Sequence, residues 1–283
     1  MKKAAKRISV VVPTYNQAEY LWACLDSIWF QDYPDIEIIV VADPSPDNTA
    51  EVLAAYRRAV ENDRVSHAVR LEADGSVSRA EFPRYRAEGR RLIICESETR
   101  LGHTPSYNKG FKLASGEYCT YVASDDICHP QMLSEMSRYL DSNEADFIYS
   151  DMFVVDDDMC ILREFKLPDY SFEASFCDWY MCGVSKLYRR SLHEQFGYYD
   201  NAYTANDHEC YLRFVLGGAR FKHIPKVLYS VRSHDQRSSD VHSEASWKKL
   251  FAESSSLVER ARDLSRQDER RSDAFQAIQD GEQ

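Results

Sequence analysis

Hydrophobic residues in the first part of the chain gather in short runs that are separated by amphipathic stretches. Residues 8–12 and 36–41 each have the length and the β-branched character of a strand that is buried on both faces. The apolar residues between the two runs recur at the spacing of one helical face: Tyr20, Leu21, Cys24, Leu25 and Ile28. The pattern therefore predicts a strand, a helix and a second strand in this order.

The same alternation continues to about residue 126. The pattern predicts a helix over residues 49–60, a strand over 92–95, a helix over 106–113 and a strand over 118–123. Alternating strands and helices predict an α/β fold with a parallel sheet, whose right-handed crossovers place the loops at its carboxyl edge. Open sheets of this kind bind ligands at that edge.

Three later features predict the domain organisation. Residues 64–90 hold six arginines with weak periodicity and predict an inserted hairpin or flap. Beyond residue 150 the alternation becomes irregular and aromatic residues are dense, as in a substrate-binding half. From about residue 243 one apolar stripe predicts a helix docked on its own domain, with a partner-binding coil as the alternative: Leu250, Phe251, Leu257, Val258, Ala261 and Leu264. We expect one domain over residues 1–240, with halves meeting near 126, and a helical extension over 241–283.

Composition narrows the classes of function. The 283 residues carry 35 basic and 46 acidic side chains, a formal net charge of -11, so no sequence-independent binding to nucleic acid is expected. No apolar run reaches the roughly 18–20 residues that span a bilayer, and we expect a cytoplasmic protein without a transmembrane segment. Eight cysteines without CxxC pairs favour buried or half-buried free thiols over a zinc site or a disulfide framework.

Acids at the ends of two predicted strands are candidates for chemistry. Asp43 stands where a carboxylate can accept hydrogen bonds from ribose hydroxyls or a base imide, although it could equally form the turn over residues 43–47. Asp125 and Asp126 follow a buried strand, where adjacent acids cost free energy unless a partner pairs with them. Mg²⁺ or Mn²⁺ is such a partner, together with water and a substrate diphosphate; a solvated turn is the alternative. The loop over residues 13–16 lacks GxGxxG, which argues against a dinucleotide site.

Several motifs in one order carry a family resemblance. They are Ile8 to Asn16, the 36–43 strand with its acid, Asn108-Lys109-Gly110, Ala114-Ser115-Gly116-Glu117-Tyr118, Ser124-Asp125-Asp126, residues 147–151, 188–192 and 196–200, Asn206-Asp207-His208-Glu209, and residues 230–234. Over residues 8–239 the chain resembles the inverting family 2 glycosyltransferases. The resemblance implies the GT-A fold: a mostly parallel, Rossmann-like sheet with helices on both faces, followed here by a helical extension.

The resemblance implies transfer of a sugar, with inversion, from a nucleotide diphosphate to a hydroxyl of a glycan or lipid-linked acceptor in polysaccharide synthesis. UDP is the first choice of carrier. The first half would bind this donor and the second half the acceptor. By motif position, the donor would be bound by Pro13, Thr14, Tyr15, Asp43, Asn108, Asp125 and Arg232. The divalent cation, Mn²⁺ or Mg²⁺, would be held by Asp126, Asp125 and His234.

Asp207 would be the catalytic base of such an enzyme. Without the motif match it is an acid at a helix start, favoured by the macrodipole, and His234 is a surface or structural histidine. Trp179 and Tyr180 are candidates for stacking on an acceptor sugar. We expect Asp43, Asp126 and Asp207 to converge around one cleft.

Departures from the family pattern keep other functions open. Many relatives carry an acid where Asn206 and Ala123 stand and an arginine at the place of Tyr107. A catalytically weakened sugar-nucleotide-binding or scaffold module of the same fold is therefore the alternative to an enzyme. A nucleotidyltransferase would need a Gly-rich basic loop after the first strand, which the sequence lacks. A lipid-linked acceptor would bring the protein to the inner face of a membrane, although its net charge opposes strong electrostatic anchoring.

Overall fold

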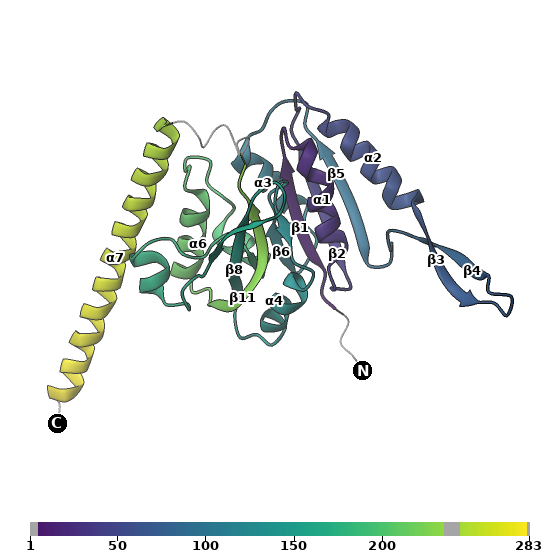
Figure 1. Cartoon of the computed structure of the whole chain (residues 1–283). Helices are drawn as coiled ribbons and strands as arrows, with labels where there is room; N and C mark the ends of the chain where they lie inside the picture. The colour runs from purple at the N-terminus through teal and green to yellow at the C-terminus, as the bar shows by residue number, and fades with distance from the viewer. Residues whose placement is uncertain (1–4, 235–243, 282–283) are drawn as a thin grey trace. The chain divides into compact units, whose positions relative to one another are not determined.

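The computed structural model describes residues 5–234 and 244–281, with side chains up to residue 267 (Figure 1). Contacts divide the chain into two compact units, Met1–Ser134 and Glu135–Gln283. The halves predicted from the sequence meet at residue 126, a few residues before this division. The predicted boundary at residue 240 lies outside the described residues.

The first unit is built on a parallel sheet with the strand order β5-β2-β1-β6. In register, Ile38 of β2 lies beside both Val10 of β1 and Leu92 of β5. Every residue of β2 is buried, which confirms a strand covered on both faces. The strands are β1 (Ile8–Thr14), β2 (Ile36–Ala42), β5 (Arg90–Glu96) and β6 (Tyr118–Tyr121).

Helices cover both faces of this sheet. The steps from β1 to β2 and from β2 to β5 run in one direction along the sheet, whereas the step from β5 to β6 runs in the other. Right-handed crossovers therefore place α1 and α2 on one face and α3 on the opposite face. The helices are α1 (Ala18–Trp29), α2 (Thr49–Asn62) and α3 (His103–Leu113). The predicted α/β fold of the first half is confirmed, with element ends that differ by a few residues.

The predicted insertion is a β-hairpin. β3 (Arg64–Leu71) and β4 (Val77–Pro83) form a separate two-stranded antiparallel sheet that extends from the end of α2 (Figure 1). Between the hairpin and β5, Tyr85 is fully buried and packs edge-on against Trp29 and Tyr56. These rings fix the base of the hairpin to the first unit.

The second unit is organised around β8 (Phe147–Val155). β11 (Phe221–Arg232) pairs with β8 in parallel, whereas β9 (Ile161–Phe165) and β10 (Lys186–Arg189) pair with it in antiparallel. β7 (Ile127–Cys128) belongs to the first unit, and α4 (Met132–Asp141) begins just before the division. The remaining elements of the second unit are the π-helical turn η1 (Glu173–Cys177), α5 (Ser191–Phe196), α6 (Asn206–Leu216) and α7 (Glu244–Gly281).

The C-terminal helix α7 packs on the second unit, as predicted, through η1 and α6. Leu257, Val258 and Ala261 are buried in this contact. Phe251, predicted to lie in the same buried stripe, is instead 53% exposed, because it faces the surface with Trp247, whose ring stacks on it. The prediction that all cysteines are buried or half-buried was wrong for Cys160, which lies exposed in the turn before β9.

None of the helices in the described ranges combines the length and the apolar character that crossing a bilayer requires.

Candidate functional site

Asp43 lies directly after β2, and its side chain is anchored to the start of α3. Its Oδ2 accepts hydrogen bonds from the backbone N–H groups of Leu101 and Gly102 at 3.0 and 2.9 Å. Its Oδ1 is buried and has no hydrogen-bond partner among the described residues. A buried acceptor without a donor costs about 1–3 kcal/mol, so this oxygen is suited to accept a hydrogen bond from a ligand.

The loop after β1 lies beside Asp43. The Asp43 backbone N–H donates to the Thr14 carbonyl at 3.1 Å, and the buried Thr14 Oγ1 also lacks a hydrogen-bond partner in the described part of the chain. The Arg100 guanidinium lies 4.0 Å from the centroid of the half-buried Tyr15 ring. The structure thus brings Pro13, Thr14 and Tyr15 together with Asp43 at the carboxyl ends of β1 and β2.

Asp125 and Asp126 follow β6 and reach the same edge of the sheet, because β6 is parallel to β1. Their exposed fractions are only 7% and 1%. Two hard carboxylates suit Mg²⁺ or Mn²⁺, which take one or two protein carboxylates and complete their shell with water and phosphate oxygens. The acid pair fits such a cation. Within residues 5–234 and 244–267 no three His, Cys, Asp or Glu side chains form a metal cluster, so a cation here would need ligands from the donor.

Cys128 lies two residues after the acid pair. Burial, and then the charge of Asp126, raise the pKa of its thiol. Mg²⁺ and Mn²⁺ prefer oxygen ligands to sulfur, so the acid pair suits them better than this cysteine.

Asn108 is half-buried on α3, whose motif has a clear packing role. A Cβ on Gly110 would lie 2.2 Å from Val11 Cγ1, so only glycine allows α3 to approach β1 this closely. Lys109 Nζ donates to Ser97 Oγ at 3.0 Å, and the Tyr107 ring packs on Tyr121 with 4.3 Å between centroids. The motif positions α3, and the donor contact of Asn108 stays a prediction.

Sequence reasoning missed a buried network at the opposite, amino edge of the sheet. Glu37 is fully buried in β2, and its Oε1 accepts hydrogen bonds from Ser9 Oγ and the Ser115 backbone N–H, both at 2.9 Å. Arg91 Nη1 donates to its Oε2 at 3.1 Å, and Gly116 N–H donates to Ser9 Oγ at 2.8 Å. The Ala114-Ser115-Gly116 motif is therefore explained by packing. The sequence feature that could have indicated this network is Glu37, an acid inside an otherwise apolar strand.

Asp207 lies in the first turn of α6, in the second unit, and it has an ion-pair partner that the sequence did not reveal. Lys186 Nζ, at the start of β10, is 3.5 Å from Asp207 Oδ2. Lys186 is fully buried, and this burial lowers the pKa of its ammonium, although the charge of Asp207 opposes the shift. The Asp207 side chain is 18% exposed, although its Oδ1 is itself buried, and the ion pair with Lys186 restrains the orientation of the carboxylate.

The C-terminal helix holds the start of α6. Glu253 Oε2 of α7 accepts hydrogen bonds from the backbone N–H groups of Thr204 and Ala205 at 2.7 and 2.9 Å. Asn206 Oδ1 accepts one from the Asp207 N–H at 2.7 Å. Carboxylates at helix N-termini satisfy unpaired N–H groups and interact favourably with the helix dipole. The predicted extension therefore takes part in positioning Asp207.

Arg232 ends β11 and is buried against the turn that follows β8. Its Nη1 donates to the Asp157 carbonyl at 2.7 Å, and its Nη2 contacts the Met159 sulfur at 3.2 Å. These contacts restrain the guanidinium within the second unit. His234 is half-buried two residues further on, and the chain beyond it to residue 243 lies outside the described residues. Their contacts with the diphosphate and the metal stay predictions.

The two aromatic candidates for acceptor binding differ in setting. Trp179 is 38% exposed and its ring lies 6.3 Å from that of Phe251. Tyr180 stacks on His208, next to Asp207, with 5.2 Å between ring centroids. Trp179 thus presents a ring to solvent, whereas Tyr180 supports the start of α6.

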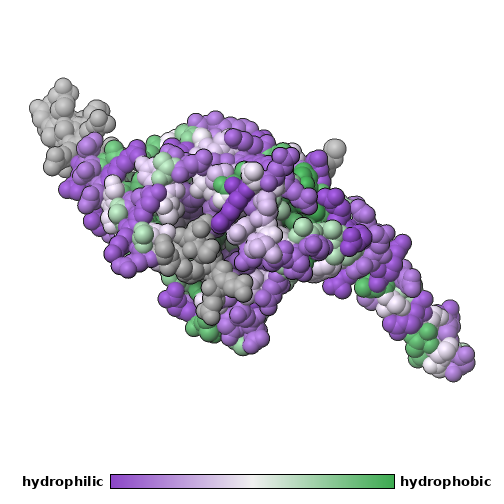
Figure 2. All heavy atoms as spheres, turned by 90° about the horizontal axis from the view of Figure 1, so that it is seen from above, coloured by the Kyte–Doolittle hydropathy of each residue, from purple (hydrophilic) through white to green (hydrophobic). Residues whose placement is uncertain are grey.

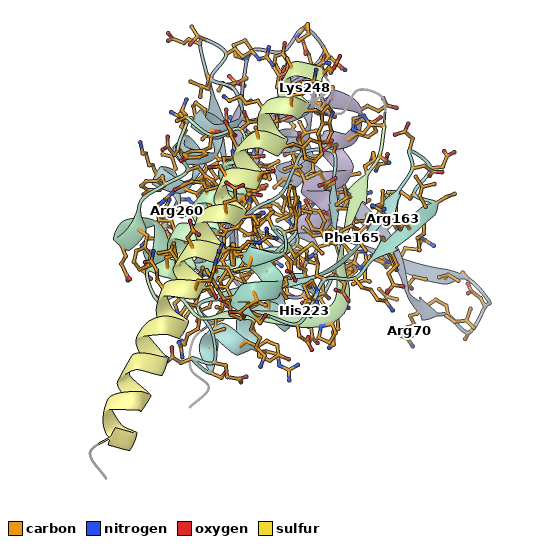
Figure 3. The ribbon with its side chains drawn as sticks, turned by 90° about the vertical axis from the view of Figure 1, so that its left-hand side faces the viewer. Arg70, Arg163, Phe165, His223, Lys248 and Arg260 are labelled. Atoms are coloured by element: carbon orange, nitrogen blue, oxygen red, sulfur yellow. The ribbon has the colours of Figure 1, made fainter. Side chains whose placement is uncertain are left out.

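A second buried network, also missed by sequence reasoning, supports the sheet of the second unit. His223, labelled in Figure 3, lies between Asp151 and Asp169, with ring nitrogens 2.8 and 3.0 Å from their Oδ1 atoms. Asp151 Oδ1 also accepts the Leu167 N–H at 2.9 Å. These bonds tie β8 and β11 to the segment before η1.

The candidate acids thus form two groups, one in each unit. Asp43, Asp125 and Asp126 share one sheet edge of the first unit, and Asp207 with Lys186 lies in the second. Convergence of all of them around one cleft stays a prediction.

Comparison with known proteins agrees with the motif resemblance. Residues 9–197 match the family model of glycosyl transferase family 2. An uncharacterized glycosyltransferase of Methanocaldococcus jannaschii is 24% identical over 232 residues, 80% of this chain and 70% of that protein. The glycosyltransferase GlyG of Streptococcus pneumoniae is 25% identical over 265 residues, 87% of this chain and 77% of the relative.

Solved structures show the same fold. TarS 1-349 of S. aureus, crystallised with UDP-GlcNAc, has a TM-score of 0.61 at 22% identity and matches 82% of this chain. A mannosyltransferase of Pyrobaculum calidifontis, in complex with GDP-Man and Mn²⁺, has a TM-score of 0.59 at 19% identity and matches 89%. This chain spans only 60% and 63% of the lengths of those two chains. The likeness establishes the GT-A fold.

Proposed function

The chain belongs to glycosyl transferase family 2, and from this premise we propose that it transfers a sugar from a nucleotide diphosphate, UDP in the first place, to a hydroxyl of a cell-surface glycan or its lipid-linked precursor. The observation that carries the proposal is the buried Asp43 Oδ1, for which residues 5–234 and 244–267 supply no hydrogen-bond donor. A base imide or a ribose hydroxyl would supply that donor. The complexes of TarS with UDP and with UDP-GlcNAc support the choice of UDP.

Asp125 and Asp126 would hold a divalent cation, with Mn²⁺ as the first choice because the Pyrobaculum enzyme was solved with it. The cation, when bound, stabilises the negative charge of the departing diphosphate. His234 and Arg232 would reach the same diphosphate from the end of β11. The Tyr15 ring and Thr14 would hold the nucleoside beside Asp43.

Asp207 would take the proton of the acceptor hydroxyl. An acceptor oxygen that attacks the anomeric carbon opposite the leaving group gives inversion in one displacement, and a carboxylate on that side acts as general base. Lys186 and Glu253 fix this carboxylate from two sides, through an ion pair and through the backbone at the start of α6. Trp179 offers an exposed face on which an acceptor sugar can stack.

The test separates binding from chemistry. Asp207→Asn should keep UDP-sugar affinity within about threefold and lower kcat by about 10³-fold or more, since general-base catalysis contributes 10²–10⁴-fold. Asp126→Ala should lose the Mn²⁺-dependent part of donor affinity, measured by calorimetry with and without chelator. Asp158→Asn, an exposed acid in the turn before β9, is the control.

Two outcomes would overturn parts of the proposal. Unchanged turnover in Asp207→Asn would remove the base assignment, and donor binding that ignores Mn²⁺, Mg²⁺ and chelator would remove the metal assignment. Tight donor binding without turnover for any acceptor would favour the binding or scaffold module that Asn206 and Ala123 leave open. A lipid-linked acceptor would place the reaction at the cytoplasmic face of a membrane, which flotation with acceptor-loaded vesicles tests.

A further inference from the structure

The β3–β4 hairpin has no core of its own. Leu71, Val77 and Phe82 are 72%, 48% and 46% exposed, and nearly all hairpin positions are exposed or half-buried on both faces. Figure 2 shows apolar residues among hydrophilic ones on this hairpin, at the right of the view. An isolated two-stranded hairpin is marginally stable in water, so these features call for a partner.

The two strands of the hairpin differ in regularity. β3, which carries the Arg70 labelled in Figure 3, has an irregularity between Ala68 and Arg70 that interrupts its ladder. β4 runs regularly from Val77 to Pro83, and its outer edge pairs with no other strand among the described residues. A bulged edge resists further pairing, whereas a regular exposed edge is a template for it.

The sequence of β4, Val-Ser-Arg-Ala-Glu-Phe-Pro, is complementary to itself when it is read in antiparallel around its central residue. With Ala80 opposite the Ala80 of the partner subunit, Arg79 stands opposite the partner's Glu81. The symmetry repeats this pair on the other side of the axis. Opposite charges directly across an antiparallel pair are stabilising.

We propose that β4 forms an antiparallel strand pair with β4 of a second copy of this chain, about a two-fold axis at Ala80, giving a four-stranded sheet across a homodimer.

The base of the hairpin has a surface that suits the tip of the partner. Antiparallel pairing brings the tip of each hairpin beside the base of the other. The tip carries the acids Glu72 and Asp74 with the exposed Leu71. At the base, a groove of about 670 Å³ is lined by aromatic and apolar residues, by Arg57, Arg86 and Arg90, and by one acid, Glu61, so that its charged lining is net basic. Apolar contact and opposite charge therefore match at both ends of the pair.

A membrane surface fits the hairpin less well. Basic residues at the projecting end would be needed to bind anionic lipids, yet residues 72–76 carry two acids and no base. An isologous contact between identical copies instead requires that each surface carry both charges of a pair, as Arg79 and Glu81 of β4 do.

Sedimentation velocity on the full chain across a concentration series tests the proposal. Arg79→Glu and Glu81→Arg should each raise the dimer dissociation constant by about tenfold or more, because each puts like charges opposite one another twice. The double exchange Arg79→Glu/Glu81→Arg should restore dimerisation to within about threefold. Arg163→Glu, the same charge change at an exposed position of β9 outside the hairpin, is the control and should leave the constant within about threefold.

A cross-link tests the register. In a Cys160→Ser background, which removes the exposed native thiol, Ala80→Cys should form an oxidised dimer, because directly opposed residues lie about 4.5–5.5 Å apart. Ser78→Cys should not, since two such residues would stand four positions apart in register. A monomer at all accessible concentrations, or a dimer that ignores both charge reversals, would overturn the proposal. None of these residues belongs to the proposed glycosyl transfer site, so the outcome is independent of that function.

Discussion

Glu253 offers the sharpest test of how the second unit positions its acid. This side chain comes from α7, yet one of its oxygens accepts the N–H groups of both Thr204 and Ala205, immediately before the turn that carries Asp207. Lys249 Nζ lies 3.5 Å from the other oxygen, and the Glu253 carboxylate is 16% exposed. We therefore expect Glu253→Ala to release the start of α6 while leaving the donor half unchanged.

The expected loss of stability follows from the two hydrogen bonds that Glu253→Ala removes. Hydrogen bonds to a charged group contribute about 1.5–3 kcal/mol each, and truncation also leaves two N–H donors without a partner. Allowing for partial replacement by water, Glu253→Ala should lower the free energy of unfolding by about 2–4 kcal/mol. A displacement of the base by about 1 Å costs on the order of 10²-fold in rate, so kcat should fall about 10- to 100-fold at unchanged donor KM.

Urea unfolding and initial rates over donor and acceptor concentrations measure both effects. Glu253→Gln, which keeps one acceptor oxygen, should recover part of the stability and of kcat. Glu259→Ala, an exposed acid on the same helix, is the matched control. If Glu253→Ala and Glu259→Ala lose equal stability and equal kcat, the positioning role of Glu253 is refuted. A rise in donor KM without a change in kcat would refute it as well.

Three further predictions concern buried groups. Lys186→Met should cost about 3–5 kcal/mol of stability, because it removes one partner of a buried ion pair, and the added Asp207→Asn change should recover most of the loss in a double-mutant cycle. Asp43→Ala should weaken UMP binding without metal by about tenfold, as expected for loss of a hydrogen bond to a charged group. Burial lowers the pKa of His208 from its ordinary value of about 6.5 to about 4. The free energy of unfolding should therefore fall as pH drops from about 6.5 to about 4, because the unfolded chain takes up the proton first. His208→Phe should remove up to about 3 kcal/mol of that fall.

Each of these has a control. A Lys186→Met loss that persists fully in the double variant would show that the ion pair is not its cause. UMP affinity unchanged in Asp43→Ala would remove Asp43 from the nucleoside pocket. The exposed His67→Gln change should leave the acid dependence intact, and an equally steep fall in His208→Phe would assign the effect elsewhere. His193, whose pKa burial also lowers to about 4, should keep a residual dependence in that variant.

Periodicity was sufficient for the layers of the first unit because β1 and β2 bury continuous apolar runs and α1 buries one apolar face. β1, β2, β5, β6 and the hairpin lie where the apolar runs and the arginine-rich insert placed them. The second unit was less predictable, since its strands pair out of sequence order and its core is a set of stacked aromatics. Spacing along the chain carries no information about such long-range pairs.

The site was predictable only where a residue type demands an explanation by itself. Adjacent acids after an apolar strand pointed to Asp125 and Asp126, which are buried as the argument from desolvation requires. Lys186 gave no comparable signal, because a lysine beside a predicted strand is ordinary on a surface and becomes informative only when it is buried. Glu253 gave no signal either, because an acid on the polar face of an amphipathic helix is ordinary at a surface.

The buried Glu37 has a consequence for how relatives of this chain are classified. Its hydrogen bonds with Ser9 and Ser115 stabilise the sheet. This stabilisation does not depend on the acids at the opposite edge. A relative without the carboxylates proposed for the site would still be expected to keep the serine–glycine pair at 115–116. Matches at these positions therefore indicate the shared fold, and activity has to be judged from the residues proposed for the site, Asp43, Asp126 and Asp207.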